Sequence, residues 1–336
     1  SELYSWYLRS PKYRTLARKL VEASRTRKPA DIISESVAKV LYGEVSPYSA
    51  TRLERYSACA FAHFLQYGLK LTERAEYEFR AMDMGNIMHK VLESLIKEVN
   101  KEKLSLAELS EEERDALADR LVDTISADYG NTILKSSARN EYMIQRTKRM
   151  VRRAVWAIQK RLKSGEFEPE GVEVVFQGGR IDRVDTMETD DGKLYVRVID
   201  YKTGNTSFDL VSLYHGLQLQ LMIYMDGALT VEQNKHKDKE VIPAGVFYYN
   251  IKDPMIQEKI DADIETVQEK VLKELKMNGL VLKDKELVQK MDSSLVSIPV
   301  SFNKDGSFRK NSSVASKEQF DILNRYVKTK ISHIRQ

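Results

Sequence analysis

The run Gly179-Arg-Ile-Asp-Arg-Val-Asp-Thr-Met187, followed by Leu194-Tyr-Val-Arg-Val-Ile-Asp-Tyr-Lys202, decides the fold of this chain. Both runs mix β-branched residues with alternating polar ones, which is typical of strands. Thr189-Asp-Asp-Gly192 lies between them and has the composition of a turn. The sequence therefore predicts a β-hairpin whose centre is close to Asp191.

The register of this hairpin brings two acids together. Asp182 and Asp200 each lie nine positions from Asp191, so an antiparallel pairing centred there places them opposite each other. Side chains of a strand alternate between its two faces, so Lys202 shares the face of Asp200, while Asp185 has the opposite parity to Asp182. We therefore expect Asp182, Asp200 and Lys202 to form one patch, with Asp185 outside it.

Such a patch suits a hard divalent cation. Cβ atoms of cross-strand neighbours are roughly 4.5 to 5.5 Å apart, and two carboxylates at that separation repel each other unless a cation lies between them. Mg²⁺ or Mn²⁺ is the expected occupant, and Lys202 would orient or help to deprotonate an attacking water. The alternative is a surface hairpin with an ordinary Asp–Lys ion pair, which contributes little.

The elements on either side of the hairpin predict an α/β fold. Hydrophobic periodicity indicates mainly helical structure up to residue 164, and Ser105-Leu-Ala-Glu108, Ser110-Glu-Glu-Glu113 and Ser316-Lys-Glu-Gln319 have the pattern of helix-starting capping boxes. The sequence also predicts strands over 172–176, 244–250 and 296–302. It predicts helices over 210–228, over 262–277 and from 316 to the end.

Composition narrows the class of protein. The 336 residues are 42% hydrophobic and 31% charged, without a membrane-spanning run or a signal peptide, so we expect a cytoplasmic globular protein with no membrane partner. No G-x-x-x-x-G-K-S/T loop is present, so an ATP-driven motor must lie outside this chain. Eight Lys and Arg residues between 146 and 163 indicate either a solvated helix face or a ridge that contacts phosphates.

The order of the motifs resembles that of the RecB-type PD-(D/E)XK nucleases. Gly179-Arg-Ile-Asp182, Ile199-Asp-Tyr-Lys-Thr-Gly204 and Gln220-Leu-Met-Ile-Tyr224 are similar to the catalytic strands and the following helix of that family, and Gly85-Asn-Ile-Met-His89 is similar to its upstream histidine motif. The resemblance implies that His89, Asp182 and Asp200 bind the metal. It also implies that Lys202, Gln220 and Tyr224 belong to the catalytic site. Glu173 has weaker support from the resemblance, and His63, His215, His236 and His333 have none.

Residues 48–68 and the segments 298–302 and 305–308 resemble the AddB family of helicase–nuclease proteins. In that family a first cysteine, which Cys59 matches, and three later ones hold a [4Fe–4S] cluster. Cys59 is the only cysteine here, so the cluster is expected only in a full-length protein of which this chain is a fragment cut before those cysteines. The alternative for Cys59 is a small buried residue beside Phe61 and Phe64.

We therefore predict a PD-(D/E)XK nuclease core, a mixed sheet flanked by helices, over residues 48–336. It would carry a helical extension over 1–47 and a helical insertion at about 100–165. The predicted activity is metal-dependent cleavage of DNA, as an exonuclease on the 5′-terminated strand, during double-strand-break processing with an AddA-like helicase–nuclease partner. The alternatives are a DNA-binding scaffold of such a complex and a stand-alone RecB-like nuclease. Metal binding would separate the scaffold from the enzymes.

Overall fold

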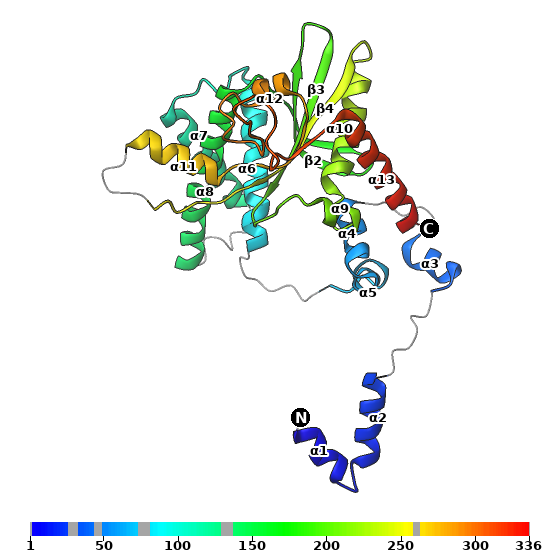
Figure 1. The fold of residues 1–336 in the computed structure, drawn as a ribbon. Helices are drawn as coiled ribbons and strands as arrows, with labels where there is room; N and C mark the ends of the chain where they lie inside the picture. Colours follow the sequence, from blue (N-terminus) through cyan, green and yellow to red (C-terminus); the bar gives the residue numbers. More distant parts are fainter. Residues whose placement is uncertain are drawn as a thin grey trace. The chain divides into compact units, whose positions relative to one another are not determined.

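A computed structural model describes residues 2–25, 33–43, 49–72, 81–128, 137–257 and 263–335 (Figure 1). Contacts divide the chain into two units, residues 1–46 with 67–70, and residues 47–66 with 71–336. The boundary predicted between residues 47 and 48 falls on residues outside those described. Among the described residues, no helix is long and apolar enough to cross a bilayer.

Within residues 2–25 and 33–43, the first unit has three α-helices. They are α1 (Glu2–Arg9), α2 (Arg14–Arg25) and α3 (Glu35–Tyr42). Ser34 caps α3, since its hydroxyl accepts a hydrogen bond from the amide of Val37. Gly43 ends the helix with φ +80°, a conformation that glycine adopts without strain.

The second unit is built on a six-stranded mixed sheet in the order β1-β2-β3-β4-β5-β6. Its strands pair antiparallel except for β3 with β4 and β5 with β6, which are parallel. This mixed sheet with flanking helices confirms the predicted α/β class. The strands are β1 (Glu168–Phe176), β2 (Gly179–Glu188), β3 (Lys193–Lys202), β4 (Glu240–Asn250), β5 (Asn278–Leu282) and β6 (Val314–Ala315).

Helices cover both faces of the sheet (Figure 1). The group α6 (Ala81–Lys101), α7 (Glu111–Asp128) and α8 (Ala138–Ser164) lies on one side, and α10 (Gln220–Lys235) lies on the other with α13 (Lys317–Arg335) against it. Because β3 and β4 are parallel, the chain must cross over between them, and α10 is that crossover. The shorter helices are α4 (Ala50–Ala58), α5 (Ala60–His63), the π-helix η1 (Phe64–Gly68), α9 (Leu210–Tyr214), α11 (Ile264–Glu274) and α12 (Lys285–Met291).

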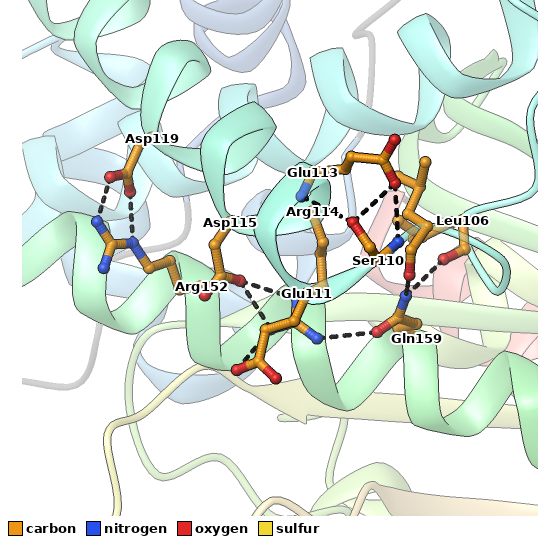
Figure 2. Close-up of polar contacts among 10 residues, drawn as sticks. Leu106, Ser110, Glu111, Glu113, Arg114, Asp115, Asp119, Arg152 and Gln159 are labelled. Carbon is orange, nitrogen blue, oxygen red and sulfur yellow. Dashed lines mark hydrogen bonds and ion pairs between the residues drawn. The ribbon is translucent and has the colours of Figure 1, made fainter.

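Polar contacts join α7 and α8, which lie within the range 100–165 (Figure 2). Ser110 and Glu113 form the predicted capping box at the start of α7, with the Glu113 amide 3.2 Å from the Ser110 hydroxyl and the Ser110 amide 3.0 Å from the Glu113 carboxylate. Arg114 donates to buried Gln159 at 2.9 Å, and Arg152 pairs with Asp119. The predicted capping box at Ser316 and Gln319 is also confirmed.

A buried charge cluster fills the interface between α8 and the sheet. Asp185 is fully buried and accepts hydrogen bonds from Arg183 at 2.5 and 2.8 Å and from Arg197 at 2.8 Å. Burial alone would raise the pKa of Asp185, but the two guanidinium groups hold it below its ordinary value. The guanidinium of Arg161 lies 4.1 Å from the ring centre of Tyr249 in the same layer. Asp185 therefore lies away from Asp182 and is satisfied by the protein.

Three element predictions were wrong. Residues 296–302 form no strand, because Pro299 lacks an amide hydrogen and the backbone groups around it bond to one another, to residues 309–313 and to Met277. An isolated bridge joins Phe302 and Phe308. The helix predicted over 210–228 is two helices, since Gly216 has φ +79° and its α-carbon lies too close to Ser57 for a side chain. Ser105 starts only a turn, and the helix begins at Glu111.

Candidate active site

The β2–β3 hairpin has the register that the sequence predicts. Pairs run from Glu188 with Leu194 to Arg183 with Ile199, so the next pair in the same register is Asp182 with Asp200. Gly192 closes the turn with φ +78°, and the amide and carbonyl groups of the turn bond across it. The turn chemistry and the strand alternation together place both acids on one face of the sheet.

Asp182 is held by a strand and a helix. Its Oδ2 atom accepts a hydrogen bond of 2.7 Å from the backbone amide of Tyr201, and it lies 3.3 Å from Nδ1 of His89. Only 14% of the Asp182 side chain is exposed. The carboxylate therefore has one backbone donor and one imidazole partner, and its remaining lone pairs are available to a cation.

Asp200 is the most perturbed acid of the site. Its side chain is 3% exposed, and burial together with the negative charge of Asp182 raises the pKa of Asp200 to about 7. Lys202 opposes this rise, since its Nζ lies 2.6 Å from Asp200 Oδ2. Among the described residues this buried oxygen accepts no well-directed hydrogen bond, so its contact with Lys202 is an ion pair. A second cation beside it would relieve the repulsion between the two acids.

The first turn of α10 orients the lysine. Lys202 Nζ donates to Gln220 Oε1 at 2.7 Å, and Gln220 Nε2 donates to the Tyr224 hydroxyl at 2.9 Å. Gln220 and Tyr224 are one helical turn apart, so their side chains meet on the face of α10 that covers the hairpin. Burial raises the pKa of Tyr224 to about 12, so its hydroxyl remains protonated at neutral pH.

Gly85 explains the position of His89. A Cβ atom at Gly85 would lie 3.2 Å from Thr203 Oγ1, so glycine lets α6 approach the segment that follows β3. His89 is one turn further along α6 and reaches Asp182. Burial alone would lower the pKa of His89, but its hydrogen bond to Asp182 and the charge of that acid raise it above its ordinary value.

Glu173 joins the same site from β1. One side-chain donor atom from each of His89, Glu173 and Asp182 lies within 4.8 Å of the other two. Burial, and then the charge of Asp182, raises the pKa of Glu173, while Arg180 pairs with it at 2.6 Å. Its φ of +52° is unusual for a residue with a side chain, and such backbone strain often occurs at functional sites. Sequence pattern alone gave Glu173 little support because it carries no spacing signal relative to the hairpin.

Glu54 is the residue that sequence reasoning missed. It lies on α4, and its Oε1 accepts hydrogen bonds from the amides of Leu219 at 2.7 Å and Gln220 at 2.9 Å. It therefore binds the N-terminal end of α10 from a position 166 residues away in the chain. No local spacing rule could have found it. The only signal in the sequence is an acid within the segment that leads to Cys59.

The donor set fits a divalent cation. Carboxylate oxygens suit Mg²⁺ and Mn²⁺, and an imidazole nitrogen is an acceptable additional ligand for Mn²⁺. His89, Asp182 and Glu173 converge closely, and Asp200 lies near enough for Asp182 and His89 to affect its pKa. A second group, Glu170, Glu232 and His236, differs because the ammonium of Lys235 already pairs with both of its carboxylates.

Cys59 is exposed at the C-terminal end of α4, so the alternative of a buried residue was wrong. Phe61 beside it is 66% exposed and forms no core around the thiol. Four cysteine ligands are needed for a typical [4Fe–4S] cluster, and this chain has one. The residues present therefore do not fit the cluster.

Much of the basic run on α8 is occupied by protein contacts. Arg152, Lys148 and Arg149 pair with Asp119, Asp123 and Asp253, and Arg161 is buried. These four side chains support the fold, which weakens the prediction of a phosphate-contacting ridge.

Comparisons with known proteins agree with this geometry. The model of the PD-(D/E)XK nuclease superfamily matches residues 47–336. A protein of Lachnoclostridium phytofermentans, named as a subunit of an ATP-dependent helicase/deoxyribonuclease, is 43% identical over 317 residues, which is 88% of this chain and 27% of that protein. Proteins with the same name in Alkaliphilus metalliredigens and Thermoanaerobacter sp. are 35% and 37% identical, over 99% of this chain and 31% of their own length.

This chain thus spans less than a third of the curated relatives that it resembles. The family match extends over the whole sheet, the hairpin acids and the helices that cover them. From its sheet, its hairpin and this match, the chain belongs to the PD-(D/E)XK nuclease superfamily.

Proposed function

We propose that this chain hydrolyses phosphodiester bonds of DNA with Mg²⁺ or Mn²⁺. The observation that carries the proposal is the convergence of Asp182, Asp200, Lys202 and His89, which come from α6 and the β2–β3 hairpin. Two acids and an imidazole in one half-buried patch can hold a cation. That cation and the neighbouring ammonium would attract a substrate that is itself a phosphate anion. Without a cation, the two acids would repel that substrate.

Each residue has a distinct role in this proposal. His89, Asp182 and Asp200 would hold the cation, with Glu173 as an additional carboxylate. A bound cation polarises the scissile phosphate and lowers the pKa of the attacking water. The Lys202 ammonium would orient the attacking water and neutralise charge that develops on the phosphate, and the proton of that water would leave to solvent. Gln220 and Tyr224 orient the Lys202 ammonium through the 2.7 and 2.9 Å hydrogen bonds.

The names of the relatives support a biological context. They are named as parts of an ATP-dependent helicase/deoxyribonuclease, so we propose that this chain is the nuclease part of a protein of that kind. It would act on double-strand-break ends with an AddA-like helicase–nuclease partner, and it would cut the 5′-terminated strand. Cys59 would serve as one ligand of a [4Fe–4S] cluster only where three further cysteines from outside this sequence complete it.

Cleavage of end-labelled linear DNA tests the activity. The wild-type chain should cut in Mn²⁺ or Mg²⁺ and not in EDTA, and a label on either end shows which strand is shortened. Asp200→Ala should be inactive, whereas Asp226→Asn, which alters a surface ion pair with Lys328, should cut at the wild-type rate. Equal activity of wild type and Asp200→Ala would refute the assignment.

Mn²⁺ titration separates the enzyme from a DNA-binding scaffold. The enzyme should bind Mn²⁺ at one site that is lost in Asp182→Ala, because Asp182 contacts both His89 and the Tyr201 amide. A scaffold that binds DNA without binding Mn²⁺ at this site would support the rival function.

A further inference from the structure

The N-terminal end of α10 is capped by another helix. Leu219, which precedes α10, has no side chain able to accept a hydrogen bond, and the amides of Leu219 and Gln220 instead donate to Glu54 Oε1 at 2.7 and 2.9 Å. A carboxylate at a helix N-terminus satisfies amides that lack partners within the helix and interacts favourably with the helix dipole. Glu54 thus caps the start of α10 from another helix.

The capped residue is the one that holds the catalytic lysine. The backbone amide of Gln220 donates a hydrogen bond to the Glu54 carboxylate, and the side-chain Oε1 of Gln220 accepts one of 2.7 Å from the Lys202 ammonium. Lys202 in turn lies 2.6 Å from Asp200. A short chain of contacts therefore links α4 to the reacting groups, through the first residue of α10.

Glu54 also lies close enough to Lys202 for the charges of the two side chains to interact. Burial raises the pKa of Glu54, while the two amides and the positive charge of Lys202 oppose that rise. The segment that carries Glu54 ends at Cys59. A displacement of α4 would therefore shift Gln220 first and, through it, Lys202.

We propose that Glu54 is a positioning residue for the nuclease site, acting through Gln220 on Lys202. This inference rests on the proposed function, because it assigns Glu54 to that same reaction. Glu54 need not touch DNA or metal. Its effect should therefore appear in the rate of the chemical step and not in DNA affinity.

The test compares two variants, each of which removes the N-terminal cap of a different helix. Glu54→Ala removes the cap of α10, and Asp284→Ala removes that of α12, where Asp284 accepts the Leu287 amide at 3.0 Å, away from the site. Both should lower the urea midpoint by similar amounts. Glu54→Ala should slow single-turnover cleavage roughly ten- to a hundredfold at unchanged DNA Kd, as expected for a misplaced catalytic group. Asp284→Ala should leave the rate unchanged.

Two further variants separate positioning from mere stability. Glu54→Gln keeps an oxygen acceptor for both amides, so it should recover most of the lost rate. In a Gln220→Ala background, Glu54→Ala should slow cleavage by less than about twofold, because the residue through which it acts is gone. The urea midpoint should still fall in that double variant.

The outcomes are distinct. The proposal is overturned if Glu54→Ala cleaves as fast as Asp284→Ala, or if its full loss of rate persists in the Gln220→Ala background. Absence of metal-dependent cleavage by the wild-type chain would instead refute the nuclease function on which the inference rests.

Discussion

Replacing Asp200 by Asn should stabilise the metal-free protein at neutral pH while it abolishes cleavage. Burial and the nearby Asp182 raise the pKa of Asp200 to about 7, from an ordinary value of about 3.9. Since the folded state binds this proton more tightly than the unfolded state, stability is lost as pH rises from about 4 to about 7. The favourable contact with Lys202 is already included in that balance.

The magnitude follows from the size of this change. The pKa of Asp200 rises by about three units on folding, and each unit corresponds to about 1.4 kcal/mol. The free energy of folding lost by pH 8 is therefore about 4 kcal/mol. Asparagine has nearly the same shape and carries no charge, so it avoids this cost. We expect Asp200→Asn to exceed the wild type in free energy of unfolding by an amount on the order of 2 to 4 kcal/mol at pH 8.

Urea unfolding in EDTA at pH 5 and pH 8 measures the difference. Fluorescence of Trp156, in a Trp6→Phe background, reports on the second unit, because Trp156 is a buried residue of α8. The advantage of Asp200→Asn should shrink on going from pH 8 to pH 5, and Asp226→Asn should show none. A wild type that is the more stable protein at pH 8 in EDTA would refute the reasoning. Excess Mn²⁺ should raise the stability of the wild type and of Asp226→Asn, but not that of Asp200→Asn.

Three further outcomes are expected. Asp185→Asn should lower the free energy of unfolding by about 3 to 5 kcal/mol, because it leaves two buried guanidinium groups without a counter-charge, and urea unfolding of Asp191→Asn, a turn residue, is its control. The lowered pKa of Asp185 also means that its contribution is present above about pH 4 and is lost in acid. Ser110→Ala should cost about 1 kcal/mol by removing the cap of α7, measured as a fall in thermal midpoint, and an unchanged midpoint would contradict that role. Arg152→Ala should change the Kd for DNA less than twofold, because Asp119 already neutralises this arginine. Fluorescence anisotropy at two salt concentrations measures that Kd. A marked loss of affinity and of its salt dependence would support the phosphate-contacting ridge after all.

Predictions succeeded where the signal is local. The β2–β3 hairpin follows from alternation and a turn, and the capping boxes at Ser110 and Ser316 follow from three-residue spacings. Prediction failed where a local pattern competes with tertiary packing. Residues 296–302 have strand composition but satisfy their backbone outside the sheet, and the buried strand β5 has no alternation to reveal it.

By itself, the sequence determined the relative placement of Asp182, Asp200 and Lys202, because strand periodicity and a hairpin centre relate positions on two adjacent strands. The nuclease class followed from the resemblance of its motif order to a known family. Only the tertiary structure decided that Glu173 approaches His89 and that Glu54 caps α10. Those contacts join segments that are far apart in the chain, and they depend on how helices pack on the sheet. No periodicity of a single element encodes such packing, so the positions of Glu173 and Glu54 beside these groups emerge only once the chain is folded.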